Sequence, residues 1–222
     1  MNLPEVVAVL AAGGVVTLRV AAGAWIVGAV AGLLFALVAR ARFVAVRVLV
    51  DLVTTCLRGV PQLVLLYLVF FGIGAKIPGI GPITAAILGL GLAEAGFNAE
   101  VYRGGFLTVG QGQRNAAASL GLSRWQTLRL VVLPIAMRFV LPALVNSFVG
   151  LLKLATLASA VGAPEILYRS TTLINEHLHI VGISLVLVAL YLVFTLPLTR
   201  AVARLEGQLR GESASETGYE QA

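Results

Sequence analysis

Long apolar stretches alternate with short polar segments along the chain. Most of the apolar stretches approach or exceed the roughly 20 residues that a helix needs to cross a bilayer. They cover residues 13–38, 63–71, 83–103, 139–160 and 181–198. The chain is 59% hydrophobic and only 12% charged, which is rare in a water-soluble domain. The pattern therefore predicts an all-α membrane protein with about five transmembrane helices, in a single domain over residues 1–210.

The shortest apolar stretch, 63–71, follows an amphipathic segment at 51–58. We expect that segment to lie at the membrane interface. Gly59 and Pro61 separate the two parts, and both residue types interrupt a helix. The sequence predicts a bend there, where the helix enters the bilayer.

A polar segment at 111–134 interrupts the apolar pattern between two spans. Its first part, 114–120, is rich in alanine, which favours a helix. Gly121 suits a left-handed helix stop. Ser123 begins a second helix, with Gln126 three residues later, as in a capping box. The segment predicts a protruding knob of two short helices.

Pro134 is expected to end the second helix of this knob before the next span. The knob surface is expected to consist of small side chains that let another protein approach its backbone. These side chains are Ala116, Ala117 and Ala118.

Positive charges predict the orientation, because arginine gathers on the cytoplasmic side of membrane proteins. With an outside N-terminus, the expected inner segments hold eleven arginines, whereas the outer segments hold only Lys76 and Arg169. The inner residues are Arg40, Arg42, Arg47, Arg103, Arg114, Arg124, Arg129, Arg138, Arg200, Arg204 and Arg210. The sequence thus predicts the N-terminus outside, the knob and C-terminus in the cytoplasm, a polar external connection at 163–180, and a disordered tail at 211–222.

Ionisable residues inside predicted spans are candidates for function, since a lone buried charge is costly. Glu94 lies near the middle of the span 83–103, and Asn98 lies one turn away on the same face. The two residues line a polar cavity, or Glu94 pairs with Lys153 to hold helices together; the spacing leaves both open. Asn146 and Lys153 share one face of the span 139–160. Glu100 is expected to pair with Arg103 near the inner boundary.

Signatures of enzymes and metal sites are missing from the sequence. It has no P-loop, no HExxH helix and no Gly-x-Ser-x-Gly elbow. His177 and His179 are expected to be solvated loop residues, and Cys56 to be a packing residue. The arginines at the span ends explain the net charge of +6 without a nucleic-acid partner.

Several segments resemble the permease subunits of ABC transporters. The knob resembles their cytoplasmic "EAA" loop, with Asn115-Ala116-Ala117 in place of Glu-Ala-Ala, Gly121 as the glycine, and Val132-Leu133-Pro134 as the close. Three further segments resemble permeases of the polar amino-acid uptake group. They are Arg58-Gly59-Val60-Pro61-Gln62, Ala99-Glu100 followed by Arg103-Gly104, and the stretch from Asn146 to Lys153. The chain departs from the family at Asn115, where an acid is usual, and at Leu154 and Ala155, where polar residues are usual.

The resemblance implies an importer in a bacterial cytoplasmic membrane, with two such permease subunits around a translocation path. ABC ATPase subunits would bind the loop and hold ATP and Mg²⁺, so that this chain itself carries no cofactor and is no enzyme. The coupling residues would be Arg114, Asn115, Ala116, Ala117, Leu120 and Gly121. The substrate pathway would include Glu94, Asn98, Asn146 and Lys153.

An extracytoplasmic binding protein would deliver a polar amino acid or similar solute to the outer loops, near Lys76 and Glu165. Two alternatives stay open on the sequence. One is a secondary transporter or channel that uses Glu94 as a proton or ion site. The other is a membrane scaffold without transport.

Overall fold

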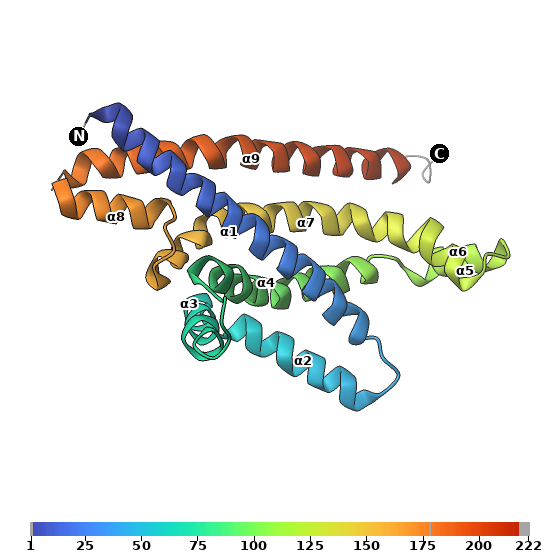
Figure 1. Ribbon diagram of the computed structural model, residues 1–222. Helices are drawn as coiled ribbons and strands as arrows, with labels where there is room; N and C mark the ends of the chain where they lie inside the picture. The colour runs from blue at the N-terminus through green and yellow to red at the C-terminus, as the bar shows by residue number, and fades with distance from the viewer. Residues whose placement is uncertain (1, 178, 218–222) are drawn as a thin grey trace.

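Every regular element is helical in the computed structural model, which describes residues 2–177 and 179–217 (Figure 1). The elements are α1 (Leu3–Val38), α2 (Val44–Gly59), α3 (Gln62–Tyr67), η1 (Leu68–Gly74), α4 (Pro82–Leu107), α5 (Gln111–Ser119), α6 (Arg124–Thr127), η2 (Leu128–Val132), α7 (Leu133–Leu154), η3 (Ala155–Val161), α8 (Ile166–His177) and α9 (Ile180–Thr217). Four helical stretches are long and apolar enough to cross a membrane, and the pair α2 with α3–η1 makes a fifth if it counts as one bent span. This confirms the predicted helical membrane fold.

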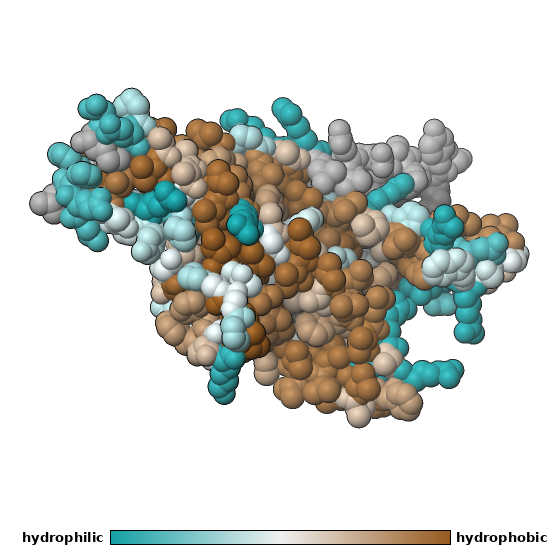
Figure 2. Space-filling model, viewed as in Figure 1, coloured by the Kyte–Doolittle hydropathy of each residue, from teal (hydrophilic) through white to brown (hydrophobic). Residues whose placement is uncertain are grey.

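Polar and apolar side chains are separated along the length of the molecule. Apolar residues cover most of its middle in Figure 2, and hydrophilic residues gather toward its two ends. The N-terminus and α8 lie at one end, whereas the α5–α6 knob lies at the other (Figure 1). This separation is what an apolar bilayer around the middle of the protein requires.

Helices α1 and α4 form the centre of the fold through small residues. A Cβ on Gly28 would lie 2.7 Å from Cβ of Glu94, and a Cβ on Gly32 would lie 2.7 Å from Cβ of Asn98. Small residues let membrane helices pack closely, as the glycine spacing on this helix predicts. The Trp25 indole also donates a hydrogen bond of 2.7 Å to the Leu144 carbonyl on α7. This bond joins α1 to α7, and α4 packs against both helices.

The bent span differs from the prediction in the position of its bend. Helix α2 and the stretch Gln62–Gly74 meet at 105°. The break lies level with the middle of α4, because the Arg58 stem packs against Gly96 and Leu66 packs against Gly89. Residues 51–58 therefore run along the C-terminal half of α4, and the two glycines leave room for α2 and α3 to approach it.

Pro134 does not end the second knob helix, so that prediction was wrong. Residues Arg124–Val161 form one continuous helical stretch that includes Pro134 and Pro142. Just before Pro134 the helix widens into the π-turn η2. Proline cannot donate the usual backbone hydrogen bond, and a widened turn accommodates that loss without a break.

The structure also corrects the two polar segments near the C-terminus. The predicted external connection at 163–180 contains the 12-residue helix α8. Helix α9 continues to Thr217, beyond the start of the predicted disordered tail. Alanine and glutamate favour a helix in this segment, and residues 218–222 lie outside the described residues.

Candidate functional site

The knob has the local structure that its sequence predicts. Gly121 has φ of +74°, the left-handed conformation that ends α5. The Leu122 N–H donates to the Ala117 carbonyl (3.1 Å) and the Gly121 N–H to the Ala118 carbonyl (3.0 Å), which is a Schellman stop. Ser123 and Gln126 then form a reciprocal capping box at the start of α6.

The knob presents large apolar side chains as well as small ones. Leu120 is 80% exposed and Trp125 is 67% exposed. Ala116 and Ala118 are exposed, but Ala117 is buried, which corrects the prediction that all three alanines form the surface. A tryptophan and a leucine on a protruding turn are suited to insert into a groove on a partner.

Arg114 and Asn115 are engaged within the knob itself. The Arg114 guanidinium donates to the carbonyls of Phe106 (3.1 Å) and Val109 (3.4 Å), where α4 ends. The Asn115 side-chain oxygen accepts a hydrogen bond of 3.0 Å from Gln111. Arg114 therefore holds the knob to the end of α4, and Asn115 stabilises α5 from within, roles that the sequence did not reveal.

Glu94 and Asn98 are buried side by side against α1. Their exposed fractions are 6% and 1%. Ser147 on α7 lies beside the Glu94 carboxylate, and its hydroxyl donates a hydrogen bond of 2.9 Å to the Leu144 carbonyl. Neither amide atom of Asn98 has a hydrogen-bond partner among the residues that the structure describes, although buried polar atoms nearly always have one. The pair is thus a polar group enclosed among α1, α4 and α7.

Asn146 and Lys153 do not join this buried pair. Both are exposed on α7, and no atom would lie within 4 Å of a Cβ on Gly150 between them. Among the ion pairs of the described residues, none joins Lys153 to Glu94. The four predicted pathway residues therefore form two groups, one buried and one on an open helix face.

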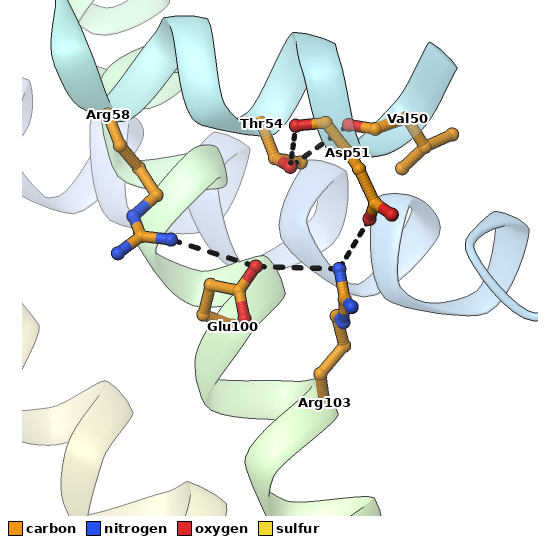
Figure 3. A network of polar contacts seen from close by, with 6 residues as sticks. All are labelled: Val50, Asp51, Thr54, Arg58, Glu100 and Arg103. Atoms are coloured by element: carbon orange, nitrogen blue, oxygen red, sulfur yellow. Dashed lines mark hydrogen bonds and ion pairs between the residues drawn. The ribbon is translucent and has the colours of Figure 1, made fainter. Parts of the chain in front are cut away.

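An ionic network joins α2 to α4, which the sequence predicts only in part (Figure 3). The Arg103 guanidinium lies 2.6 Å from the Asp51 carboxylate and 3.5 Å from Glu100, which confirms the Glu100–Arg103 pair. Arg58 lies 3.7 Å from the same Glu100 oxygen. Asp51 and Arg58 are seven residues apart, and therefore on one face of α2. That spacing was the only signal for their part in the network.

A second buried carboxylate is Glu165, which the sequence predicts on an exposed outer connection. It has no exposed surface. Its side chain accepts hydrogen bonds from the Tyr168 N–H (2.7 Å) and the Thr17 hydroxyl (3.4 Å), so it caps α8 and ties it to α1. Burial raises the pKa of the Glu165 carboxyl, against the opposing effect of these hydrogen bonds.

The comparisons with known proteins agree with this architecture. Residues 28–211 match the family described as "Binding-protein-dependent transport system inner membrane component". The chain is 33% identical to the probable amino-acid permease protein YxeN of Bacillus subtilis, over 82% of each chain. It is 38% identical to the nopaline transport system permease protein NocQ of Agrobacterium fabrum, over 71% of this chain and 72% of NocQ. It is 31% identical to the glutamine transport system permease protein GlnP of Escherichia coli, over 69% and 71%.

Solved structures show the same fold. A chain in the crystal structure of an amino acid ABC transporter with histidines superposes with a TM-score of 0.83 at 26% identity, over 94% of this chain and 99% of that one. A chain of the MetNI methionine ABC transporter, in an inward-facing conformation, superposes with a TM-score of 0.73 at 21% identity over the same shares.

Proposed function

The chain belongs to the family of binding-protein-dependent transport system inner membrane components, and we propose that it is the permease subunit of an ATP-driven importer for a polar amino acid or a similar small solute. The named substrates and descriptions of YxeN, NocQ and GlnP support this substrate class. We further propose that the protein lies in a bacterial cytoplasmic membrane with its N-terminus outside and its knob inside.

The knob is the observation that carries this proposal. It protrudes between two membrane helices, is stapled to the end of α4 through Arg114, and presents Leu120 and Trp125 to a partner. We propose that this partner is an ABC ATPase subunit, which binds ATP and Mg²⁺ and hydrolyses the nucleotide. The permease itself then needs no cofactor.

The other end of the molecule is proposed to receive substrate from an extracytoplasmic binding protein. Lys76 lies in the connection before α4, and α8 presents exposed residues at the same end (Figure 1). The sequence predicts Glu165 on this surface, but its side chain is buried. We therefore propose that the exposed residues of α8, and not Glu165, contact the binding protein.

A second permease subunit is proposed to cover the open face of α7 with Asn146 and Lys153. The translocation path would then run between the two subunits, with Glu94 and Asn98 beneath its wall. Transport requires two conformations whose relative stability changes when ATP closes the ATPases on the knob.

The test is to purify the tagged chain from its host in mild detergent and ask which subunits come with it. We expect an ATP-hydrolysing subunit to co-purify with the wild type and to be lost with Leu120→Asp. The matched control is Ile77→Asp, another exposed aliphatic residue, in the connection at the opposite end of the molecule.

Uptake in proteoliposomes then separates the proposal from a secondary transporter that uses Glu94. Uptake driven by ATP supports the importer. Uptake driven by a proton gradient without ATP, together with loss of transport in Glu94→Gln, would replace the importer with the secondary transporter. A scaffold would show neither form of uptake.

A further inference from the structure

The ionic network between α2 and α4 lies within the membrane-spanning part of the protein, along the C-terminal half of α4. The Arg58 stem packs against Gly96 of α4. Gly96 is 11 residues from the inner end of that 26-residue helix, which places it about 16 Å from that end. Because the apolar core of a bilayer is about 30 Å thick, Arg58 is anchored near mid-depth, and its guanidinium extends toward Glu100.

The charged groups of this network are not enclosed by their own chain. The side chains of Arg58 and Glu100 are 44% and 41% exposed, and those of Arg103 and Asp51 are 38% and 50% exposed. Phe97, which the Arg58 guanidinium covers at 5.8 Å, is 43% exposed. Charges at this depth face water or protein, since contact with lipid tails is too costly.

Arg58 is the member of the network with spare hydrogen-bonding capacity. A guanidinium has five N–H donors, and Arg58 has only the 3.7 Å contact to Glu100, with no hydrogen bond from its guanidinium to the residues that the structure describes. Arg103, in contrast, lies 2.6 Å from Asp51. A guanidinium with free, paired donors is suited to bind a carboxylate.

We propose that the face of α2 with Asp51, Thr55 and Arg58 lines the water-filled path, and that the Arg58 guanidinium binds the carboxylate of the transported solute. This inference rests on the proposed import of an amino acid or similar solute. In the absence of solute, Glu100 holds the guanidinium in place. The solute carboxylate then takes up the donors that Glu100 leaves free.

Helix α2 offers its own matched probes for the water-filled face. Thr55 lies on the charged side, between Asp51 and Arg58. Cys56, the only cysteine of the sequence, is the next residue and is exposed on the side of Leu52 and Leu49. Neighbouring helical residues point about 100° apart at nearly the same depth. A thiol at either position therefore reports the environment of one side of α2.

The first experiment labels the assembled transporter in lipid nanodiscs with the charged thiol reagent MTSES, which reacts only with thiolates in water. We expect Thr55→Cys in a Cys56→Ser background to react roughly tenfold faster than Cys56 in the wild type, because the charged reagent does not enter the lipid around an outward-facing thiol. Both should react fully after unfolding in SDS. Equal rates at the two positions, or no reaction at Thr55→Cys, would overturn the water-filled face.

The second experiment measures uptake of the amino acid that wild-type proteoliposomes import fastest. We expect Arg58→Gln to raise KM by roughly tenfold or more with a smaller change in kcat, and Arg58→Lys to show an intermediate KM, since lysine lacks the paired donors. The matched control is Arg40→Gln, because Arg40 also stacks on a phenylalanine, Phe106, but lies at the end of α1.

The outcomes separate the inference from the proposed function. If Arg58→Gln keeps the wild-type KM and its uptake, Arg58 does not bind the solute carboxylate, and the proposed importer function still stands. If the wild type imports no amino acid when ATP is supplied, the proposed importer function itself is wrong. If Arg58→Gln fails to assemble, Arg58→Lys decides: a wild-type KM there overturns the carboxylate site, and a raised KM supports it.

Discussion

Gly28 on α1 lies directly against Glu94 on α4, with 2.7 Å between its added Cβ and the Glu94 Cβ. Gly32 packs against Asn98 in the same way. The backbone of α1 thus closes one side of the buried polar pair, and Ser147 on α7 lies beside Glu94. Any opening toward the pair must therefore move α1 or α7 away from α4.

A larger side chain at Gly32 should destabilise this contact. A Cβ there would meet the Ala99 nitrogen at 3.0 Å and the Ala95 carbonyl at 3.1 Å, and backbone atoms cannot move aside as a flexible side chain can. We expect Gly32→Val to lower the free energy of unfolding by about 1–3 kcal/mol, measured by thermal unfolding in nanodiscs. Gly182→Val in α9, where the added Cβ meets nothing within 4 Å, is the control. Equal losses for both variants would contradict this packing.

Asn98 is expected to cost stability, because its buried amide is unpaired. Replacement by leucine removes the unpaired polar atoms and keeps the number and branching of the side-chain heavy atoms, so Asn98→Leu should raise the free energy of unfolding by about 1 kcal/mol. The measurement is again the unfolding midpoint, with the exposed Asn146→Leu as control. A lower midpoint for Asn98→Leu would show that the amide has a partner in the membrane, such as a bound water.

Glu165 should make stability depend on pH in the direction opposite to most carboxylates. Burial raises the pKa of its carboxyl in the folded protein, so the folded state holds the proton more tightly than the unfolded chain, whose glutamate pKa is about 4.3. The free energy of unfolding contributed by this group therefore falls as pH rises from about 4 toward the folded pKa.

Glu165→Gln removes this titration and keeps an oxygen to accept the Tyr168 N–H. We expect the unfolding midpoint of this variant to change less between pH 4 and pH 8 than that of the wild type. At pH 8 its midpoint should be higher than that of the wild type. Glu176→Gln, in the exposed part of α8, should keep the wild-type profile. Identical profiles for the wild type and Glu165→Gln would rule out this role for Glu165.

Gly121 should tolerate asparagine better than a β-branched residue. At φ of +74° the cost is conformational, since an added Cβ would meet nothing within 4 Å. We expect Gly121→Val to cost about 1–2 kcal/mol locally and to reduce recovery of the ATPase subunit, with Gly121→Asn close to the wild type. Gly112→Val in α5, also without neighbours within 4 Å, is the control. If Gly121→Val recovers as much ATPase as Gly112→Val, the stop does not shape the binding surface.

The sequence predicts the parts of this fold that depend on local pattern. The spans follow from apolar length, and the stop at Gly121 and the capping box at Ser123 follow from residues a few positions apart. The network of Asp51 and Arg58 with α4 was not predictable, because it depends on where α2 bends relative to Gly96. Glu165 was misplaced for a related reason: a carboxylate in a polar segment appears solvated until α8 folds over it. The spacing of Asn146 and Lys153 in the sequence predicts that they share one helix face, but it does not predict how far they lie from Glu94.

The continuous helix across Pro134 connects the knob to the opposite end of the molecule. Residues Arg124–Val161 comprise 38 residues, or about 57 Å at the α-helical rise, so a tilt of about 5° displaces one end by about 5 Å relative to the other. One end of this helix carries Trp125. The other end is followed by Gly162 and by Glu165, which directly precedes α8. A displacement at the knob is therefore transmitted along one helix to the point where α8 is tied to α1.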